Sequence, residues 1–172
     1  FKVSPMEEIQ ADLQESKDIY GKVSRVFLVN GDPFVLPAAQ LATIAEMINT
    51  TYPEVKTIAC YASIHNIMNK SIEDLKDLRR LKINELNISV ESGLDKVLQQ
   101  LNKGYTLADA YEQLGKLSAA GMDYGLNIII GAAGSGLHHE NAQANARLLN
   151  ETQPYLLFTG SLHYDRGCTL FE

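Results

Sequence analysis

Apolar residues recur along this chain with two spacings. Segments with an apolar residue at every second position, or nearly continuous apolar runs, alternate with segments in which apolar residues are three or four positions apart. The shorter period is clearest between Leu86 and Val90, where every second residue is apolar, as in a strand with one buried face. More continuously apolar segments, typical of parallel strands covered on both faces, occur at residues 23–30, 55–62, 124–130 and 155–163. The pattern therefore predicts five strands.

The intervening segments have apolar residues three or four positions apart, as helices packed on a core do. Residues 41–48 are the clearest example. Two helix starts carry a capping-box pattern, in which a hydroxyl residue is followed three positions later by an acid: Ser71 with Asp74, and Thr106 with Asp109. The segments between strands are thus predicted to be helical.

Helix and strand alternate without a hairpin signal, and the strands return about every thirty residues, the size of one βα unit. We therefore predict an α/β fold with a parallel sheet, formed by residues 1–172 as a single domain. In such a sheet the loops that follow the strands all lie at one rim. That geometry brings together five residues that end or follow the predicted strands: Asp32, Ser63, Glu91, Gly131 and His163.

Composition narrows the possible functions. The chain has 15 basic and 21 acidic residues, a net charge of −6 and no basic block, so a broad nucleic-acid or lipid-binding surface is not expected. No apolar run is long enough to span a membrane and no signal-peptide pattern opens the chain, which favours a soluble, cytoplasmic protein. The two cysteines, Cys60 and Cys168, do not suggest a disulfide framework.

Both ends of the chain look interrupted. The first residue is Phe1 rather than methionine, and a predicted helix follows almost at once. Residues 167–170 (GCTL) look like the start of a segment that continues. We therefore expect the chain to be a piece cut at both ends from a longer protein.

Four stretches resemble successive loops of a known family. They are FLVNGDPFVLP (27–37), YASIHN (61–66), SVESGLDKVLQQLNKGYT (89–106) and NIIIGAAGSG (127–136). Each stretch alone is too short to identify a family. Together and in this order they resemble the radical S-adenosylmethionine (SAM) superfamily, in the branch of oxygen-independent coproporphyrinogen oxidase and the Elongator catalytic subunit. The resemblance implies a TIM-like partial (βα)6 barrel with about five parallel strands present, the first strand missing, and SAM lying across the rim.

The resemblance also assigns residues to the methionine end of SAM. The loop Gly31-Asp32-Pro33 matches the one that holds the methionine amino group, through its backbone and an acidic or polar side chain. Lys103 matches a basic position that pairs with the methionine carboxylate, and Glu91 a position that contacts the ribose or the methionine end. An acid for an ammonium group and a base for a carboxylate form a chemically coherent pair.

The adenosine end is assigned in the same way. Asn127 and Ile129 match strand positions that contact the ribose and the adenine, and Gly131 lets the backbone approach the adenine. Ser63, on the loop after another strand, completes the set of residues that we expect at the cofactor. Hydrogen-bonding groups for hydroxyls and an apolar shelf for a purine are what such a ligand needs.

One part of the family pattern is absent. The C-x3-C-x2-C motif, which binds a 4Fe-4S cluster on a loop after the first strand, has no counterpart here, and Cys60 and Cys168 cannot replace three converging thiolates. The resemblance therefore implies that the cluster ligands lie upstream of Phe1. The complete protein is expected to cleave SAM to a 5′-deoxyadenosyl radical and to abstract hydrogen from an unknown substrate, whereas this chain alone is expected to be inactive.

Two other functions stay open on the sequence: a non-catalytic SAM-like binding or scaffold module, and a cluster-free α/β enzyme acting on a nucleotide or sugar phosphate. The glycine-rich residues 131–136 lack the Lys-Ser/Thr of a P-loop and favour a flexible loop. Residues 138–140 (HHE) could suggest a metal site but favour a solvated helix start. Asp32 and Glu91 could also act as general acid and base in a hydrolase.

A missing first strand has a consequence for assembly. The strand predicted at residues 23–30 would lie at an uncovered edge of the sheet, and an exposed apolar edge invites pairing with another chain. We therefore expect self-association through this edge.

Overall fold

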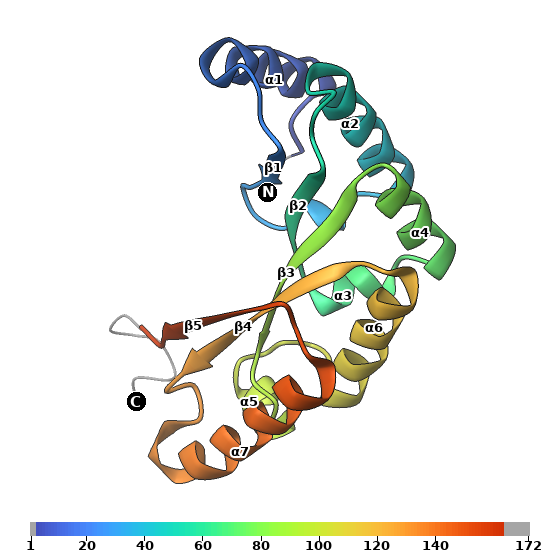
Figure 1. Ribbon diagram of the computed structural model, residues 1–172. Coiled ribbons are helices and arrows are strands. Elements are labelled where there is room, and N and C mark those ends of the chain that lie inside the picture. Colours follow the sequence, from blue (N-terminus) through green and yellow to red (C-terminus); the bar gives the residue numbers. More distant parts are fainter. Residues whose placement is uncertain (1–2, 164–172) are drawn as a thin grey trace.

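Five parallel strands form one curved sheet in the sequential order β1-β2-β3-β4-β5 (Figure 1). The structure, a computed structural model, describes residues 3–163, so the expectations for Phe1 and for residues 167–170 lie outside the described residues. The strands are β1 Arg25–Leu28, β2 Thr57–Ala62, β3 Ile83–Glu91, β4 Asp123–Ile130 and β5 Leu156–Ser161. The predicted α/β class and the partial TIM-like barrel are confirmed.

Helices α2, α4 and α6 lie along one face of this sheet (Figure 1). The helical elements are α1 Met6–Tyr20, the 3-10 turn η1 Pro33–Val35, α2 Ala38–Thr51, α3 Ile64–Met68, α4 Ile72–Arg80, α5 Asp95–Gln100, α6 Leu107–Ala120 and α7 Gly134–Thr152. Within residues 3–163, no helix has both the length and the apolar character that crossing a membrane requires.

Three helical starts differ from the sequence prediction. The loops expected after β1 and β2 contain η1 and α3, because the side chains of Asp32 and Ser63 cap their first turns. Helix α7 begins at Gly134 rather than at residue 138, so half of the glycine-rich loop is helical. The residue before it is Ala133, whose side chain cannot cap a helix, so no capping residue marks this start.

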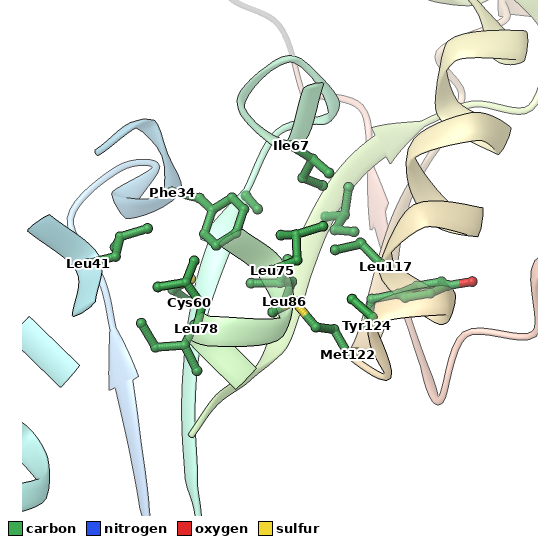
Figure 2. Packing of buried hydrophobic residues seen from close by; sticks show 14 of the residues in the cluster. Phe34, Leu41, Cys60, Ile67, Leu75, Leu78, Leu86, Leu117, Met122 and Tyr124 are labelled. Atoms are coloured by element: carbon green, nitrogen blue, oxygen red, sulfur yellow. The ribbon is translucent and has the colours of Figure 1, made fainter. Parts of the chain in front are cut away.

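The core lies between the sheet and the helices. Leu86, Ile88 and Val90 of β3 are fully buried on the helix-covered face, and Asn87 and Ser89 point to the opposite face, as alternation along a strand requires. Figure 2 shows Leu86 among side chains from the neighbouring strands and helices, including Cys60 and Leu117. The polar residues that alternate with apolar ones in β3 therefore lie on the face of the sheet that helices α2, α4 and α6 do not cover.

A polar tie joins three strands at their amino ends. Glu85 in β3 accepts hydrogen bonds from the guanidinium of Arg25, at the start of β1, and from the hydroxyl of Tyr155, just before β5. Burial alone would raise the pKa of Glu85, but these hydrogen bonds outweigh it and lower that pKa. Burial and the bond to Glu85 raise the pKa of Tyr155 to about 12. The tie therefore holds the carboxylate charged at neutral pH.

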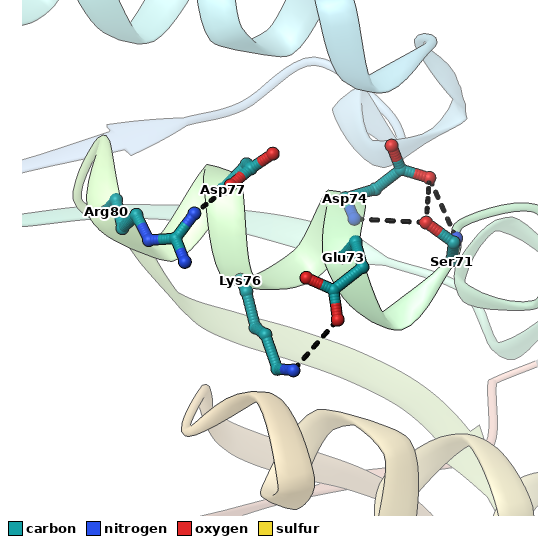
Figure 3. A network of polar contacts seen from close by, with 6 residues as sticks. All are labelled: Ser71, Glu73, Asp74, Lys76, Asp77 and Arg80. Atoms are coloured by element: carbon teal, nitrogen blue, oxygen red, sulfur yellow. Dashed lines mark hydrogen bonds and ion pairs between the residues drawn. The ribbon is translucent and has the colours of Figure 1, made fainter.

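The capping box of α4 gives a first prediction. The Asp74 carboxylate accepts from the backbone N–H of Ser71 at 2.8 Å and from its hydroxyl at 2.7 Å (Figure 3), and these bonds lower the pKa of Asp74. A folded pKa below the unfolded one means that the stabilisation is complete above the unfolded pKa of about 3.9 and is lost as the pH falls through the folded pKa. Asp74→Asn should cost about 0.5 kcal/mol at neutral pH, the low end for an exposed cap.

Urea unfolding at pH 7 and near pH 2 measures this loss. The difference between wild type and Asp74→Asn should shrink at the acidic pH. Asp77→Asn is the control for the change of charge on the same helix, where Asp77 pairs with Arg80 on the exposed surface (Figure 3). A penalty for Asp74→Asn that stays constant down to the acidic pH would contradict the capping role.

Strand β1 lies at one edge of the described sheet, as predicted for the segment 23–30. It is shorter than predicted, because only residues Arg25–Leu28 are paired with β2. Val29, just beyond β1, is largely exposed. Self-association through this edge stays a prediction.

Candidate functional site

The carboxyl ends of β1 to β4 lie at one rim because each strand is parallel to its neighbour. Asp32, Ser63 and Gly131 follow three of these strands within a few residues, and Glu91 is the last residue of β3. The structure thus brings these four predicted residues to the same rim. His163 follows β5 in the same way and is the last described residue.

Asp32 links the first two loops of this rim. Its Oδ1 accepts from the backbone N–H of Phe34 at 3.0 Å. Its Oδ2 accepts from the backbone N–H of Ser63 at 2.9 Å and from the Asn66 side chain at 2.7 Å. A carboxylate has about four acceptor sites, so three donors from the protein occupy most of its capacity.

Lys70 links the same two loops by a hydrogen bond that runs the other way, from a donor on the second loop to an acceptor on the first. Only 5% of Lys70 is exposed, and its ammonium donates to the backbone carbonyl of Phe34 at 2.6 Å while lying 4.3 Å from the centre of the Phe34 ring. Burial lowers the pKa of Lys70, and the charge of Asp32 opposes that shift. Sequence reasoning missed both Lys70 and Asn66. Asn66 lies in α3, whereas Lys70 lies just after the end of that helix, and no local pattern in the sequence marks either residue.

Glu91 and Lys103 form the second charged group of the rim. Their side chains are 14% and 21% exposed, and Lys103 Nζ lies 3.5 Å from Glu91 Oε1. This distance is longer than the roughly 2.8 Å of a tight charge-assisted hydrogen bond, so both groups keep capacity for a ligand. Lys103 returns to Glu91 because α5 ends and the chain reverses through left-handed backbone at Asn102 and Gly104.

Helix α7 holds the turn that follows Glu91. Glu91 has a φ of 74°, a left-handed conformation that is strained for a side chain of its kind. The buried Ser92 hydroxyl donates to Asn141 Oδ1 at 2.6 Å, and the Gly93 N–H donates to Asn145 Oδ1 at 2.6 Å. These two asparagines, which sequence reasoning also missed, therefore fix the direction in which the end of β3 leaves the sheet.

Asn127 lies on β4 beside Ser89 of β3. Its Nδ2 is 3.4 Å from the Ser89 hydroxyl, a long contact. Its Oδ1 is buried and has no hydrogen-bond partner among residues 3–163, and the same holds for Oδ1 of Asn87. Leaving a buried acceptor without a donor costs free energy. These two oxygens could therefore accept hydrogen bonds from a ligand on this face of the sheet.

Ile129 and Gly131 lie where β4 ends. Ile129 packs against a small apolar cluster formed by Val97, Ala132 and Ala133, apart from the main core. Gly131 has a φ of 93°, which favours glycine, and it starts the turn into α7. The two positions therefore form an apolar shelf next to an exposed backbone turn.

No group of three or more His, Cys, Asp or Glu residues within residues 3–163 is arranged to hold a metal ion. Cys60 is buried in the core, and burial raises the pKa of its thiol, which disfavours the thiolate that a metal or cluster needs. His138 and His139 are exposed on α7, next to each other in sequence. Cys168 lies outside the described residues. The thiolates that a 4Fe-4S cluster requires are therefore not supplied by this part of the chain.

The comparison with protein families identifies the superfamily of this fold. Residues 1–143 match the model of the radical SAM superfamily. Among curated proteins, the heme chaperone HemW of Bacillus subtilis is 23% identical over 135 residues, which cover 78% of this chain and 36% of HemW.

Solved structures share the fold at low sequence identity. Coproporphyrinogen III oxidase (HemN) from Escherichia coli, described as a radical SAM enzyme, superposes with a TM-score of 0.70 and 16% identity, covering 90% of this chain and 36% of HemN. Elp3 from the archaeon Methanocaldococcus infernus gives 0.68 and 12% identity, covering 95% of this chain and 43% of that one. At these identities the superpositions show a shared fold. The chain spans less than half the length of each of these proteins.

Proposed function

The chain belongs to the radical SAM superfamily, and from this premise we propose that it forms the SAM-binding part of a radical SAM enzyme. In the complete protein, SAM is cleaved to a 5′-deoxyadenosyl radical that abstracts hydrogen from a substrate. The observation that carries the proposal is the family match over residues 1–143, which includes every rim loop from Gly31 to Gly131. We further propose a cytoplasmic location, on the grounds of sequence alone.

The rim residues fit the pieces of SAM. The methionine carboxylate has a cation in Lys103, and the loosely paired Glu91 lies beside it. A ribose hydroxyl is the kind of donor that the partnerless Oδ1 of Asn127 needs. Ile129 and the turn at Gly131 offer an apolar shelf and a close backbone approach to a purine.

The residues of this chain do not fit the 4Fe-4S cluster. The sequence has two cysteines, whereas a cluster with one open iron needs three thiolates that converge on one point. We therefore propose that the cluster ligands belong to a part of the protein outside these 172 residues. Held by such ligands, the cluster would supply the electron for cleavage of SAM.

A titration of this chain with SAM, followed by amide chemical shifts, tests the binding part of the proposal. Without the bonds of the cluster iron to methionine, we expect a dissociation constant on the order of millimolar. The shifts should concentrate at the rim residues 31–32, 91, 103 and 127–131. Asn127→Ala should weaken binding about fivefold, the scale of one hydrogen bond. Asn150→Ala, exposed on α7, is the matched control and should leave the affinity unchanged.

The other functions give different outcomes. Saturable shifts with a nucleotide or sugar phosphate and none with SAM would favour a cluster-free α/β enzyme. For the complete protein, anaerobic reconstitution with iron and sulfide should yield 5′-deoxyadenosine from SAM. Binding of SAM without formation of 5′-deoxyadenosine would favour a non-catalytic binding or scaffold module.

A further inference from the structure

We propose that Asp32, Asn66 and Lys70 form a clasp that positions the first two rim loops, and that Asp32 supports SAM through the shape of these loops rather than by an ion pair with the methionine ammonium. The clasp is the set of hydrogen bonds that these three side chains make between residues 29–37 and residues 63–70. The proposal rests on the proposed function, because it concerns the same ligand. It assigns a positioning role to Asn66 and Lys70.

The clasp is reciprocal. An acceptor of the first loop, the Asp32 carboxylate, takes two donors from the second loop, the Ser63 N–H at 2.9 Å and the Asn66 amide at 2.7 Å. A donor of the second loop, the Lys70 ammonium, reaches back to the Phe34 carbonyl of the first at 2.6 Å. Each loop therefore holds the other, and neither set of bonds depends on a ligand.

Burial strengthens the bond of Lys70 to Phe34, and three partly buried bonds leave Asp32 little freedom. Lys70 is buried against the Phe34 ring, and Phe34 itself is fully buried. Low local polarity strengthens a charged hydrogen bond and makes an unmet one costly. Because Asp32 already holds three donors, an ammonium group on a ligand would have to displace one of them or share the remaining lone pair.

Replacing Asp32 cannot separate the two roles, because its loss weakens SAM binding in either case. Replacing Lys70 can, because the two roles predict opposite signs. If Asp32 paired with the ligand ammonium, removal of the nearby Lys70 charge would strengthen its attraction for that ammonium. If Asp32 acts in the clasp, removal of Lys70 loosens both loops and weakens binding.

The experiment compares wild type, Lys70→Met and Asn66→Ala by amide-shift titration with SAM and by hydrogen exchange. Lys70→Met keeps an unbranched side chain, one atom shorter, that can still pack on Phe34, but it loses the donor. We expect SAM binding about fivefold weaker in each variant, the scale of one lost hydrogen bond. The backbone amides of Phe34 and Ser63 should exchange faster without ligand. Lys76→Met, which removes an exposed lysine paired with Glu73 on α4, is the control and should change neither readout.

Unchanged or tighter SAM binding by Lys70→Met, with unchanged exchange at Phe34 and Ser63, would overturn the clasp. If Lys70→Met does not fold, Asn66→Ala distinguishes the two roles. It removes a donor from Asp32 without removing a charge. SAM binding should then weaken if Asp32 acts in the clasp and should strengthen if Asp32 pairs with the ligand ammonium. If wild type does not bind SAM, the proposed function fails. The exchange of the two amides then still supports or overturns the clasp.

Discussion

Replacing Gly93 with alanine is expected to lower the free energy of unfolding by about 3 kcal/mol, the upper range for a forced contact in a packed site. A Cβ at Gly93 would lie 2.6 Å from the carbonyl oxygen of Ala144 and 2.8 Å from its carbonyl carbon. Both atoms belong to the backbone of α7, so no side chain can rotate away. The helix or the turn after Glu91 must move, and the bond from Gly93 to Asn145 is lost with it.

Urea unfolding with Gly115→Ala as the matched control measures this cost. Gly115 lies inside α6, and apart from its chain neighbours and the backbone of its own helix, no atom of the described residues lies within 4 Å of where a Cβ would be. Alanine there should raise the stability by about 0.5–1 kcal/mol, because glycine in a helix loses more conformational freedom on folding. Equal effects of the two substitutions would refute the close approach of α7. Gly93→Ala should also weaken SAM binding, because the same turn orients Glu91.

Phe34→Ala is expected to cost about 3–5 kcal/mol, the range for removing a buried aromatic ring. Phe34 is fully buried in η1 and packs with Leu41 and other side chains of the main core (Figure 2). Its ring also lies under the Lys70 ammonium. The substitution therefore leaves a cavity and removes one wall of the clasp.

Phe158→Ala is the control for the loss of a phenyl ring. Phe158 lies in β5 and is 44% exposed, so its truncation should cost well under half as much as that of Phe34. The two variants are compared by urea unfolding under identical conditions. A similar loss in both would mean that η1 does not pack into the core as described.

The sequence was sufficient for the fold because the signals that specify it are local. Alternation in β3 and the apolar stripe at residues 41–48 follow from periods of two and 3.6 residues, which are legible within a single element. The capping box of α4 likewise needs only Ser71 and Asp74, three positions apart. The rim residues could be assigned from sequence once the order of parallel strands was inferred, since that order places all the loops at one end.

The partners of the rim residues could not be predicted, because they lie far away in sequence. Lys70 meets Phe34 across 36 residues, and Asn141 and Asn145 meet Ser92 and Gly93 across 49 and 52 residues. No local pattern distinguishes a buried lysine or asparagine that stabilises a loop from one on a solvated helix face. The three donors that already bind the Asp32 carboxylate are likewise visible only in three dimensions.

The tie at Glu85 joins residues from near the two ends of the described chain. Arg25 and Tyr155 lie 60 and 70 residues from Glu85, on opposite sides of it in the chain, yet both bind the same carboxylate. Closing two such long loops costs conformational entropy before the bonds form, so the tie can assemble only after the intervening βα units are in place. We therefore expect the bonds to Glu85 to form late in folding, once both halves of the chain have added their strands to the sheet.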